Sequence, residues 1–308
     1  MSAEGEEPKV AMDLFDDEIF DEEPRPQRPP RNRPREPKKR RQRGSGETAK
    51  RILVALPWIV FAIAITVAGG IVFTVAMIAI GVVALREFDA IAARYRPLVI
   101  PAYVTVAALA LAAHFGAAFN VLYVIAASLP LIFAFAARPR HQDGATVSIG
   151  VTLLGALWIG IPLAHAVLLR DLPSHGAALL IDVLVGTFVA DTAAYATGRM
   201  FGSHKITPNI SPNKTIEGLI GGFLIGTMGF WFAGLYQDWL SGVDALLIGA
   251  AVAAAAPIGD LFESMLKRDL GTKDTGTIFG PHGGLLDRLD AVFFTVVVGY
   301  YLAIALVY

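Results

Sequence analysis

The sequence predicts an all-α, polytopic integral membrane protein. Apolar residues make up 55% of the 308 residues, charged residues only 17%, and the mean hydropathy is +0.55. The apolar residues form uninterrupted runs of about 20, the length that crosses a bilayer as a helix, whereas soluble domains carry periodic apolar stripes. The sequence has no cysteine, which excludes disulfides, thiolate catalysis and Cys-ligated zinc.

The first 50 residues differ from the rest of the chain. They are acidic as far as Glu23, whereas Arg25 to Arg51 holds twelve Lys or Arg against two Glu. A Pro- and Arg-rich composition cannot bury a core, so we predict a disordered cytoplasmic tail over 1–50 and a transmembrane domain over 51–308. The basic half is expected to attract anionic lipid. No nucleic-acid binding is expected, because no folded module or aromatic platform accompanies the charge.

The apolar runs predict about nine transmembrane helices. The first two runs are joined only by Gly69 and Gly70, which leaves a re-entrant pair open as an alternative. The predicted spans are 52–69, 70–86, 98–115, 119–137, 146–169, 176–198, 216–236, 243–262 and 290–308.

Alternate loops are rich in Lys and Arg, which predicts the orientation of the spans. With the N-terminus in the cytoplasm, every basic loop falls on the cytoplasmic face, as the positive-inside rule requires. Arg86 and Glu87, at the inner end of the second span, are interpreted as ordinary interfacial anchors. The basic loops are 93–97, 137–141, 198–205 and the segment after Asp260, and the loops poor in Lys and Arg are 114–120, 170–175 and 237–244.

The stretch from Asp260 to Asp290 gathers the polar residues that the rest of the chain lacks. Asp260, Glu263, Ser264 and Lys267 recur at helical spacing, so they share one face of a helix that leaves the membrane. Glycines then predict a loop whose backbone can approach a ligand closely. The glycines are Gly271, Gly276, Gly280, Gly283 and Gly284; the loop also holds Lys273, Asp274 and His282, and Asp287, Arg288 and Asp290 open the last span.

This combination is typical of a site for a polyphosphate with a divalent cation. Carboxylate oxygens bind Mg²⁺, while Lys and Arg neutralise the remaining phosphate charge. Lys267 and Arg268 taken alone fit the role of span-end anchors. Asp260 and Asp287 lie beside apolar helix, where acids are costly, and therefore indicate a function.

A second polar cluster lies on the same predicted face. Asp191 falls near the inner end of the sixth span, and the sequence SPNKT precedes the seventh. Ser211 and Thr215 are predicted to cap that helix. Lys214 fits a ligand for an anion at the positive end of the helix and a surface charge equally well.

These two polar segments resemble those of the phosphatidate cytidylyltransferase (CDP-diacylglycerol synthase) family, and the layout is similar over roughly residues 51 to 308. The family more often has Lys where this chain has Asn213, so the phosphate-binding role is carried to Lys214. The resemblance rests on Ser264-Met265-Leu266-Lys267-Arg268, Lys273-Asp274, Gly276, His282-Gly283-Gly284-Leu285-Leu286-Asp287-Arg288-Leu289-Asp290 and the run from Asp191 to Gly218.

The resemblance implies that the phosphate of phosphatidic acid attacks the α-phosphorus of CTP, giving CDP-diacylglycerol and pyrophosphate in phospholipid biosynthesis. By matching positions, Asp260 and Asp287 would hold Mg²⁺, and a second, monovalent cation is left open. The catalytic set would be Lys267, Arg268, Asp274, His282, Arg288 and Asp290; the substrate-binding set would be Asp191, Ser211, Lys214, Lys273, Gly283 and Gly284.

Two other functions are compatible with the sequence. A CTP-dependent lipid or polyprenol kinase of related architecture would transfer a γ-phosphoryl group instead. A cation-coupled transporter would use intramembrane acids as an ion path, but the ionisable residues gather at one face and do not line the midplane. The expected location is the cell membrane, with the site facing the cytoplasm; a homodimer is left open.

Overall fold

A computed structural model describes residues 45–138, 143–278 and 283–308, with side chains from Pro57 onward. Residues Leu53–Tyr308 form one compact unit. Of the residues before it, only the start of the first helix, from Ser45, is described. The predicted tail therefore lies outside the described residues, except that helix α1 already begins at Ser45.

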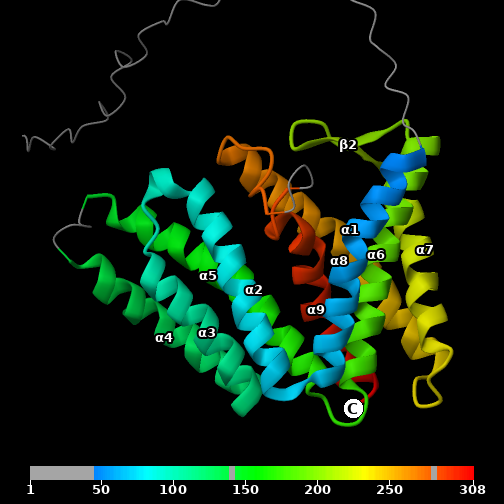
Figure 1. Cartoon of the computed structure of the whole chain (residues 1–308), viewed down its shortest axis with the longest axis horizontal. Helices are drawn as coiled ribbons and strands as arrows, with labels where there is room; N and C mark the ends of the chain where they lie inside the picture. Colours follow the sequence, from blue (N-terminus) through cyan, green and yellow to red (C-terminus); the bar gives the residue numbers. More distant parts are fainter. Residues whose placement is uncertain (1–44, 139–142, 279–282) are drawn as a thin grey trace, which may run out of the picture. The chain divides into compact units, whose positions relative to one another are not determined.

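The described residues form nine α-helices, one for each predicted span (Figure 1). Seven of them are long and apolar enough to cross a membrane; α3 and the described side chains of α1 form shorter apolar segments. The prediction of an all-α polytopic membrane protein is confirmed. The helices are α1 (Ser45–Ala68), α2 (Gly70–Ile91), α3 (Val99–Phe115), α4 (Ala118–Ala136), α5 (Ala145–Arg170), α6 (Gly176–Phe201), α7 (Ile216–Gly234), α8 (Gly242–Asp269) and α9 (Leu286–Leu306).

The boundary between the first two helices lies at the predicted glycine pair. Both Gly69 and Gly70 have positive φ, a conformation that glycine adopts without strain. Arg170 at the end of α5 donates hydrogen bonds to the carbonyls of Thr66 and Val67, so the free carbonyls at the end of α1 are satisfied. The two runs are therefore separate helices.

A short β-hairpin lies where the sequence analysis predicted a polar loop with two helix caps. Strands β1 (Lys205–Thr207) and β2 (Ser211–Thr215) pair antiparallel before α7. Thr215 caps α7 by accepting a hydrogen bond from the Gly218 amide at 3.1 Å, as predicted. The cap predicted for Ser211 is wrong, because Ser211 starts an extended strand five residues before the helix.

Two groups of helices pack side by side in the unit that begins at Leu53. Helices α2, α3, α4 and α5 pack against one another, as do α6, α7, α8 and α9, and α5 also packs on α9. Helices α6 and α7 approach closely because buried Gly222 and Gly226 of α7 face Ala190 and Ala194 of α6. Small residues of this kind are the usual contacts between membrane helices.

Four aromatic side chains join the two groups just beneath the polar end of the unit. The Trp158 ring on α5 makes edge contacts with Phe88 of α2, Phe262 of α8 and Phe293 of α9, with ring centroids 5.3 to 6.1 Å apart. Edge-to-face packing of this kind has a defined geometry. It fixes α2, α8 and α9 relative to one another, and these helices carry most of the polar residues of the site.

Two of the basic segments predicted to share a face, 93–97 and the segment after Asp260, meet at one end of the unit. The Arg94 guanidinium, in the short 3-10 helix Ala93–Tyr95 after α2, donates to the Asp269 carbonyl at the end of α8 at 2.7 Å. Arg268 donates to the Ile210 carbonyl in the hairpin turn at 3.3 Å. Figure 1 shows β2 and the end of α8 at this shared end. Which side of the membrane this end faces stays a prediction.

Candidate active site

Lys267 lies between two carboxylates at the centre of the polar end. Its ammonium nitrogen is 2.7 Å from Glu263 Oε2, one turn earlier on α8, and 2.7 Å from Asp287 Oδ1 in the first turn of α9. The side chains of Glu263 and Asp287 are only 1% and 8% exposed. Lys267 therefore joins α8 to α9, and these contacts with described residues use two of its three N–H donors.

Asp287 also holds the loop between α8 and α9. Its Oδ2 accepts hydrogen bonds from the Thr275 amide and hydroxyl, both at 2.9 Å, and from the Gly284 amide at 2.7 Å. Gly283 has a φ of +86°, a backbone conformation that glycine adopts more easily than other residues. A side chain at this position would contact the Asp287 carboxylate. In this structure the predicted substrate-binding glycines, Gly283 and Gly284, thus pack against a carboxylate of the chain itself.

Glu87 of α2 holds the same loop from the opposite side. Its Oε1 accepts from the Leu285 amide at 2.9 Å and its Oε2 from the Leu286 amide at 2.8 Å, at the start of α9. The residue is 6% exposed, and a side chain at Gly276 or Gly284 would overlap its carboxylate. The interpretation of Glu87 as an interfacial anchor is wrong: it is a buried acceptor for a helix N-terminus, where negative charge is favourable.

Replacing Glu87 by Gln is expected to loosen the start of α9. The amide retains one acceptor oxygen and places an NH₂ group against the other backbone N–H, which costs about 1–3 kcal/mol for the unpaired donor. Hydrogen exchange should show reduced protection of the Leu285 and Leu286 amides, and the unfolding temperature should fall. Asp89→Asn, two residues along α2, is the matched control. If the Leu285 and Leu286 amides are equally protected from exchange in the Glu87→Gln and Asp89→Asn variants, Glu87 does not stabilise the start of α9.

A second ion pair connects the hairpin to α8. The Lys214 ammonium nitrogen on β2 lies 2.7 Å from Asp260 Oδ2, and Asp260 Oδ1 accepts a hydrogen bond from Ser264 at 3.3 Å. Asp191 of α6 interacts electrostatically with Lys214, Asp260 and Asp290. The fold therefore brings residues of both predicted polar segments together, from four separate elements.

Carboxylates outnumber cations in this cluster. Asp191, Asp260, Glu263, Asp287 and Asp290 share the two ammonium groups of Lys214 and Lys267. Glu263 Oε1 is buried and accepts no hydrogen bond from an N–H or hydroxyl donor within the described part of the chain, and the Asp290 carboxyl group lies beside Glu263. An excess of carboxylate oxygens with an unpaired buried oxygen fits a hard divalent cation. No group of three or more acidic or histidine side chains among the described residues is already arranged to hold a metal ion, so binding requires side chains to converge.

Other predicted site residues lie around this cluster. Exposed Arg268 reaches the hairpin turn, and Ser211 lies half-buried in β2. Lys273, Asp274 and Arg288 are exposed, on the α8–α9 loop and the first turn of α9. His282 lies outside the described residues. Their catalytic or substrate-binding roles stay predictions.

Among the described residues of this region, the sequence analysis named neither Glu87 nor Thr275 in the polar segments, and it gave Glu263 no catalytic, substrate-binding or metal role. Thr275 is 4% exposed, and its hydroxyl lies between Asp287 Oδ2 and, at 3.5 Å, Glu87 Oε2. The only sequence signal for Glu87 is an acid at the end of an apolar run. Its partners are 198 and 199 residues away, so no local pattern identifies them.

The chain is similar to known proteins over most of its length. A model of the cytidylyltransferase family matches residues 49–306. A phosphatidate cytidylyltransferase of Thermotoga maritima is 43% identical over 132 residues, covering 41% of this chain and 48% of that protein. The phosphatidate cytidylyltransferase of Bacillus subtilis is 35% identical over 155 residues, covering 50% and 58%. An uncharacterized protein, YnbB, of Escherichia coli is 38% identical over 143 residues, covering 45% and 48%.

The alignments span about half the length of these curated relatives. The family model, in contrast, extends from α1 to the last turn of α9 and includes every element that contributes a residue to the polar cluster. The chain therefore belongs to the cytidylyltransferase family.

Proposed function

We propose that this protein is a phosphatidate cytidylyltransferase, which converts CTP and phosphatidic acid to CDP-diacylglycerol and pyrophosphate. The observation that carries the proposal is the acidic cluster with its two lysines at the polar end of a membrane-helix bundle. Relatives that bear the name phosphatidate cytidylyltransferase support the same assignment.

The reaction places an electrostatic demand on the site. An oxygen of the lipid phosphate forms a bond to the α-phosphorus of CTP, and the bond from that phosphorus to the bridging oxygen breaks, so pyrophosphate leaves with the electron pair. The attacking phosphate is already ionised at neutral pH, and a general base is not needed. Catalysis therefore depends on positioning two anions and stabilising the departing one.

Each part of the cluster has a role in this proposal. Lys214, on the hairpin, and Lys267, through its remaining N–H, would contact phosphate oxygens. Asp260 is the proposed Mg²⁺ ligand with the best access, because its side chain is 36% exposed. Bound Mg²⁺ would neutralise phosphate charge and polarise the reacting phosphoryl group.

The metal role predicted for Asp287 remains part of the proposal, although its contacts also support a structural role. Of the four hydrogen bonds that Asp287 accepts from described residues, three fall on Oδ2, so Oδ1, which within that part of the chain pairs with Lys267 alone, is the oxygen available to a cation. A second, monovalent cation, the homodimer and the cytoplasmic orientation also remain proposals. The orientation is supported by the basic segments that meet at the polar end.

The test is a turnover assay with product identification. The purified protein in detergent–lipid micelles, supplied with CTP, Mg²⁺ and phosphatidic acid, is expected to release pyrophosphate and form CDP-diacylglycerol. Chelation with EDTA should abolish turnover, and added Mg²⁺ should restore it. Folding is verified in parallel by circular dichroism.

The products also separate the alternatives. A lipid or polyprenol kinase would release CDP in place of pyrophosphate. A transporter would give cation flux in proteoliposomes without CTP. Absence of pyrophosphate from folded protein with Mg²⁺ and both substrates present would reject the proposed activity.

A further inference from the structure

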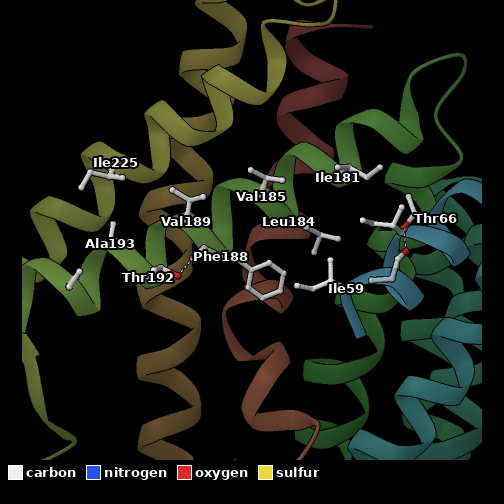
Figure 2. A pocket seen from close by; sticks show the side chains of 13 residues that line it. Ile59, Thr66, Ile181, Leu184, Val185, Phe188, Val189, Thr192, Ala193 and Ile225 are labelled. Carbon is white, nitrogen blue, oxygen red and sulfur yellow. Dashed lines mark hydrogen bonds between the residues drawn. The ribbon is translucent and has the colours of Figure 1, made fainter. Parts of the chain in front are cut away.

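An apolar groove runs along an exposed side of α6, between α6 and α1, with Ile225 of α7 also in its lining. Its volume is about 580 Å³, within the range of roughly 300–1,000 Å³ typical of ligand pockets. Figure 2 shows Ile59 of α1 beside Phe188 of α6, and Thr66 of α1 near Ile181 of α6. The two helices therefore run antiparallel along the groove.

The groove offers a ligand almost no polar group. Its lining includes only two hydroxyls, and both are used within their own helices. Thr66 donates to the Ala62 carbonyl at 2.8 Å and Thr192 to the Phe188 carbonyl at 2.7 Å. Ile59 and Phe188 remain about half exposed, at 53% and 51%. An occupant must therefore be hydrocarbon, and it can enter from the side.

The dimensions of the groove match a single acyl chain. On α6 the lining extends from Ile181 to Ala196, which at a rise of 1.5 Å per residue is about 22 Å. The hydrocarbon of one leaflet is about 15 Å deep, half of the bilayer core. The α6 wall of the groove is thus long enough to follow a lipid tail from the polar end of the helix past the membrane midplane. The described side chains of α1 line only the part farther from the polar end, from Ile59 to Thr66.

One end of the groove lies beside the polar cluster. Thr192 and Ala193 line the groove, and the preceding residue, Asp191, interacts with Lys214 and Asp260. Successive residues of a helix point about 100° apart, so α6 presents the groove and the polar cluster on neighbouring faces at the same level. A phosphate held at Lys214 would place the attached hydrocarbon at the groove.

We propose that the α1–α6 groove binds an acyl chain of the lipid phosphate substrate and so orients its headgroup toward Lys214 and Asp260. This inference rests on the proposed function for the identity of the substrate. Lipid tails already surround the helices, so the groove acts through shape and positioning and does not depend on the hydrophobic effect.

The first test narrows the groove from each side. Ala62→Phe on α1 and Ala196→Phe on α6 fill it, and Ala126→Phe, at an exposed position of α4 outside the groove, is the matched control. With dioleoyl phosphatidate, kcat/KM is expected to fall roughly ten-fold in the groove variants, the effect of a mismatch in an apolar pocket. With dihexanoyl phosphatidate, whose tails are short, it should not change, and the KM for CTP should also be unchanged. Equal losses with both lipids, or no loss, would overturn the proposal.

The second test does not depend on turnover. Phosphatidate with a photoactivatable diazirine in its tail is expected to label peptides 57–68 and 181–196 of the wild-type protein, and labelling there should fall in the two groove variants. Labelling confined to other helices would overturn acyl-chain binding in the groove even if the enzyme is active. Labelling of the groove without pyrophosphate release rejects the proposed reaction alone.

A second copy of this chain is the alternative occupant. If it covers the groove, both Phe variants should change the oligomer size in size-exclusion chromatography with light scattering, and the lipid label should not reach the groove in the wild-type protein. That result would also overturn acyl-chain binding.

Discussion

Replacing Asp260 by Asn is expected to reduce turnover by about 10²–10³-fold while the protein still folds. The Asp260 carboxylate is partly exposed and pairs with Lys214 on the hairpin, so its charge acts on the substrates and the cation more than on the helix core. Asn keeps the shape and removes the charge. The measurement is kcat/KM for pyrophosphate release over a series of Mg²⁺ concentrations, which should show a weaker Mg²⁺ dependence in the variant.

Asp244→Asn provides the control on the same helix. Asp244 lies in the first turn of α8, at the far end from the site, where its carboxylate accepts a hydrogen bond from Ser241 at 2.7 Å. This variant should retain wild-type turnover. Unchanged activity and Mg²⁺ dependence in Asp260→Asn would remove Asp260 from the metal site.

The variant Asp287→Asn separates the two proposed roles of Asp287. If Asp287 binds the metal, the variant loses Mg²⁺-dependent turnover. If Asp287 only holds the loop, the variant loses mainly stability.

Replacing Lys267 by Met is expected to lower the free energy of unfolding by about 3–5 kcal/mol. The substitution leaves two nearly buried carboxylates, those of Glu263 and Asp287, without their shared cation. The repulsion and lost solvation act at the contact between α8 and α9. The measurement is denaturant- or heat-induced unfolding in detergent, followed by circular dichroism.

Two further variants show whether the loss of stability in Lys267→Met comes from the buried, unpaired carboxylates. Arg268→Met removes the neighbouring cation, which is exposed, and should change stability by no more than about 0.5 kcal/mol. Adding Glu263→Gln to Lys267→Met removes one of the unpaired carboxylates and should recover part of the loss. Equal destabilisation by Lys267→Met and Arg268→Met would show that Lys267 does not stabilise the protein through its buried pairs.

Much of the site was predictable because its residues follow local rules. Helical spacing predicted one shared face for four residues, and the structure confirms contacts one turn apart between Ser264 and Asp260 and between Lys267 and Glu263. The glycines after Lys267 predicted the end of the helix, and α8 does end at Asp269. The ion pairs of Lys214 with Asp260 and of Lys267 with Asp287 were not predictable, because each joins two elements whose relative position depends on packing.

Two features show what local rules miss. The hairpin of β1 and β2 is short, and its strands are stabilised by pairing with each other, which apolar periodicity does not report. Glu87 looks like other acids at the end of a span. Its carboxylate meets the start of α9 because of how α2 packs in the bundle, which includes the contact of the neighbouring Phe88 with Trp158.

The sequence by itself determined the nine helices that the described residues form, their order and the two polar segments, because apolar runs of membrane-spanning length and helical spacing are local properties. The tertiary structure alone decided which charges meet. It pairs Lys214 with Asp260 and Lys267 with both Glu263 and Asp287, and it buries Glu87 against the loop. The physical reason is that ion pairs and buried hydrogen bonds depend on distances of about 3 Å between segments far apart in the chain, and only helix packing sets those distances.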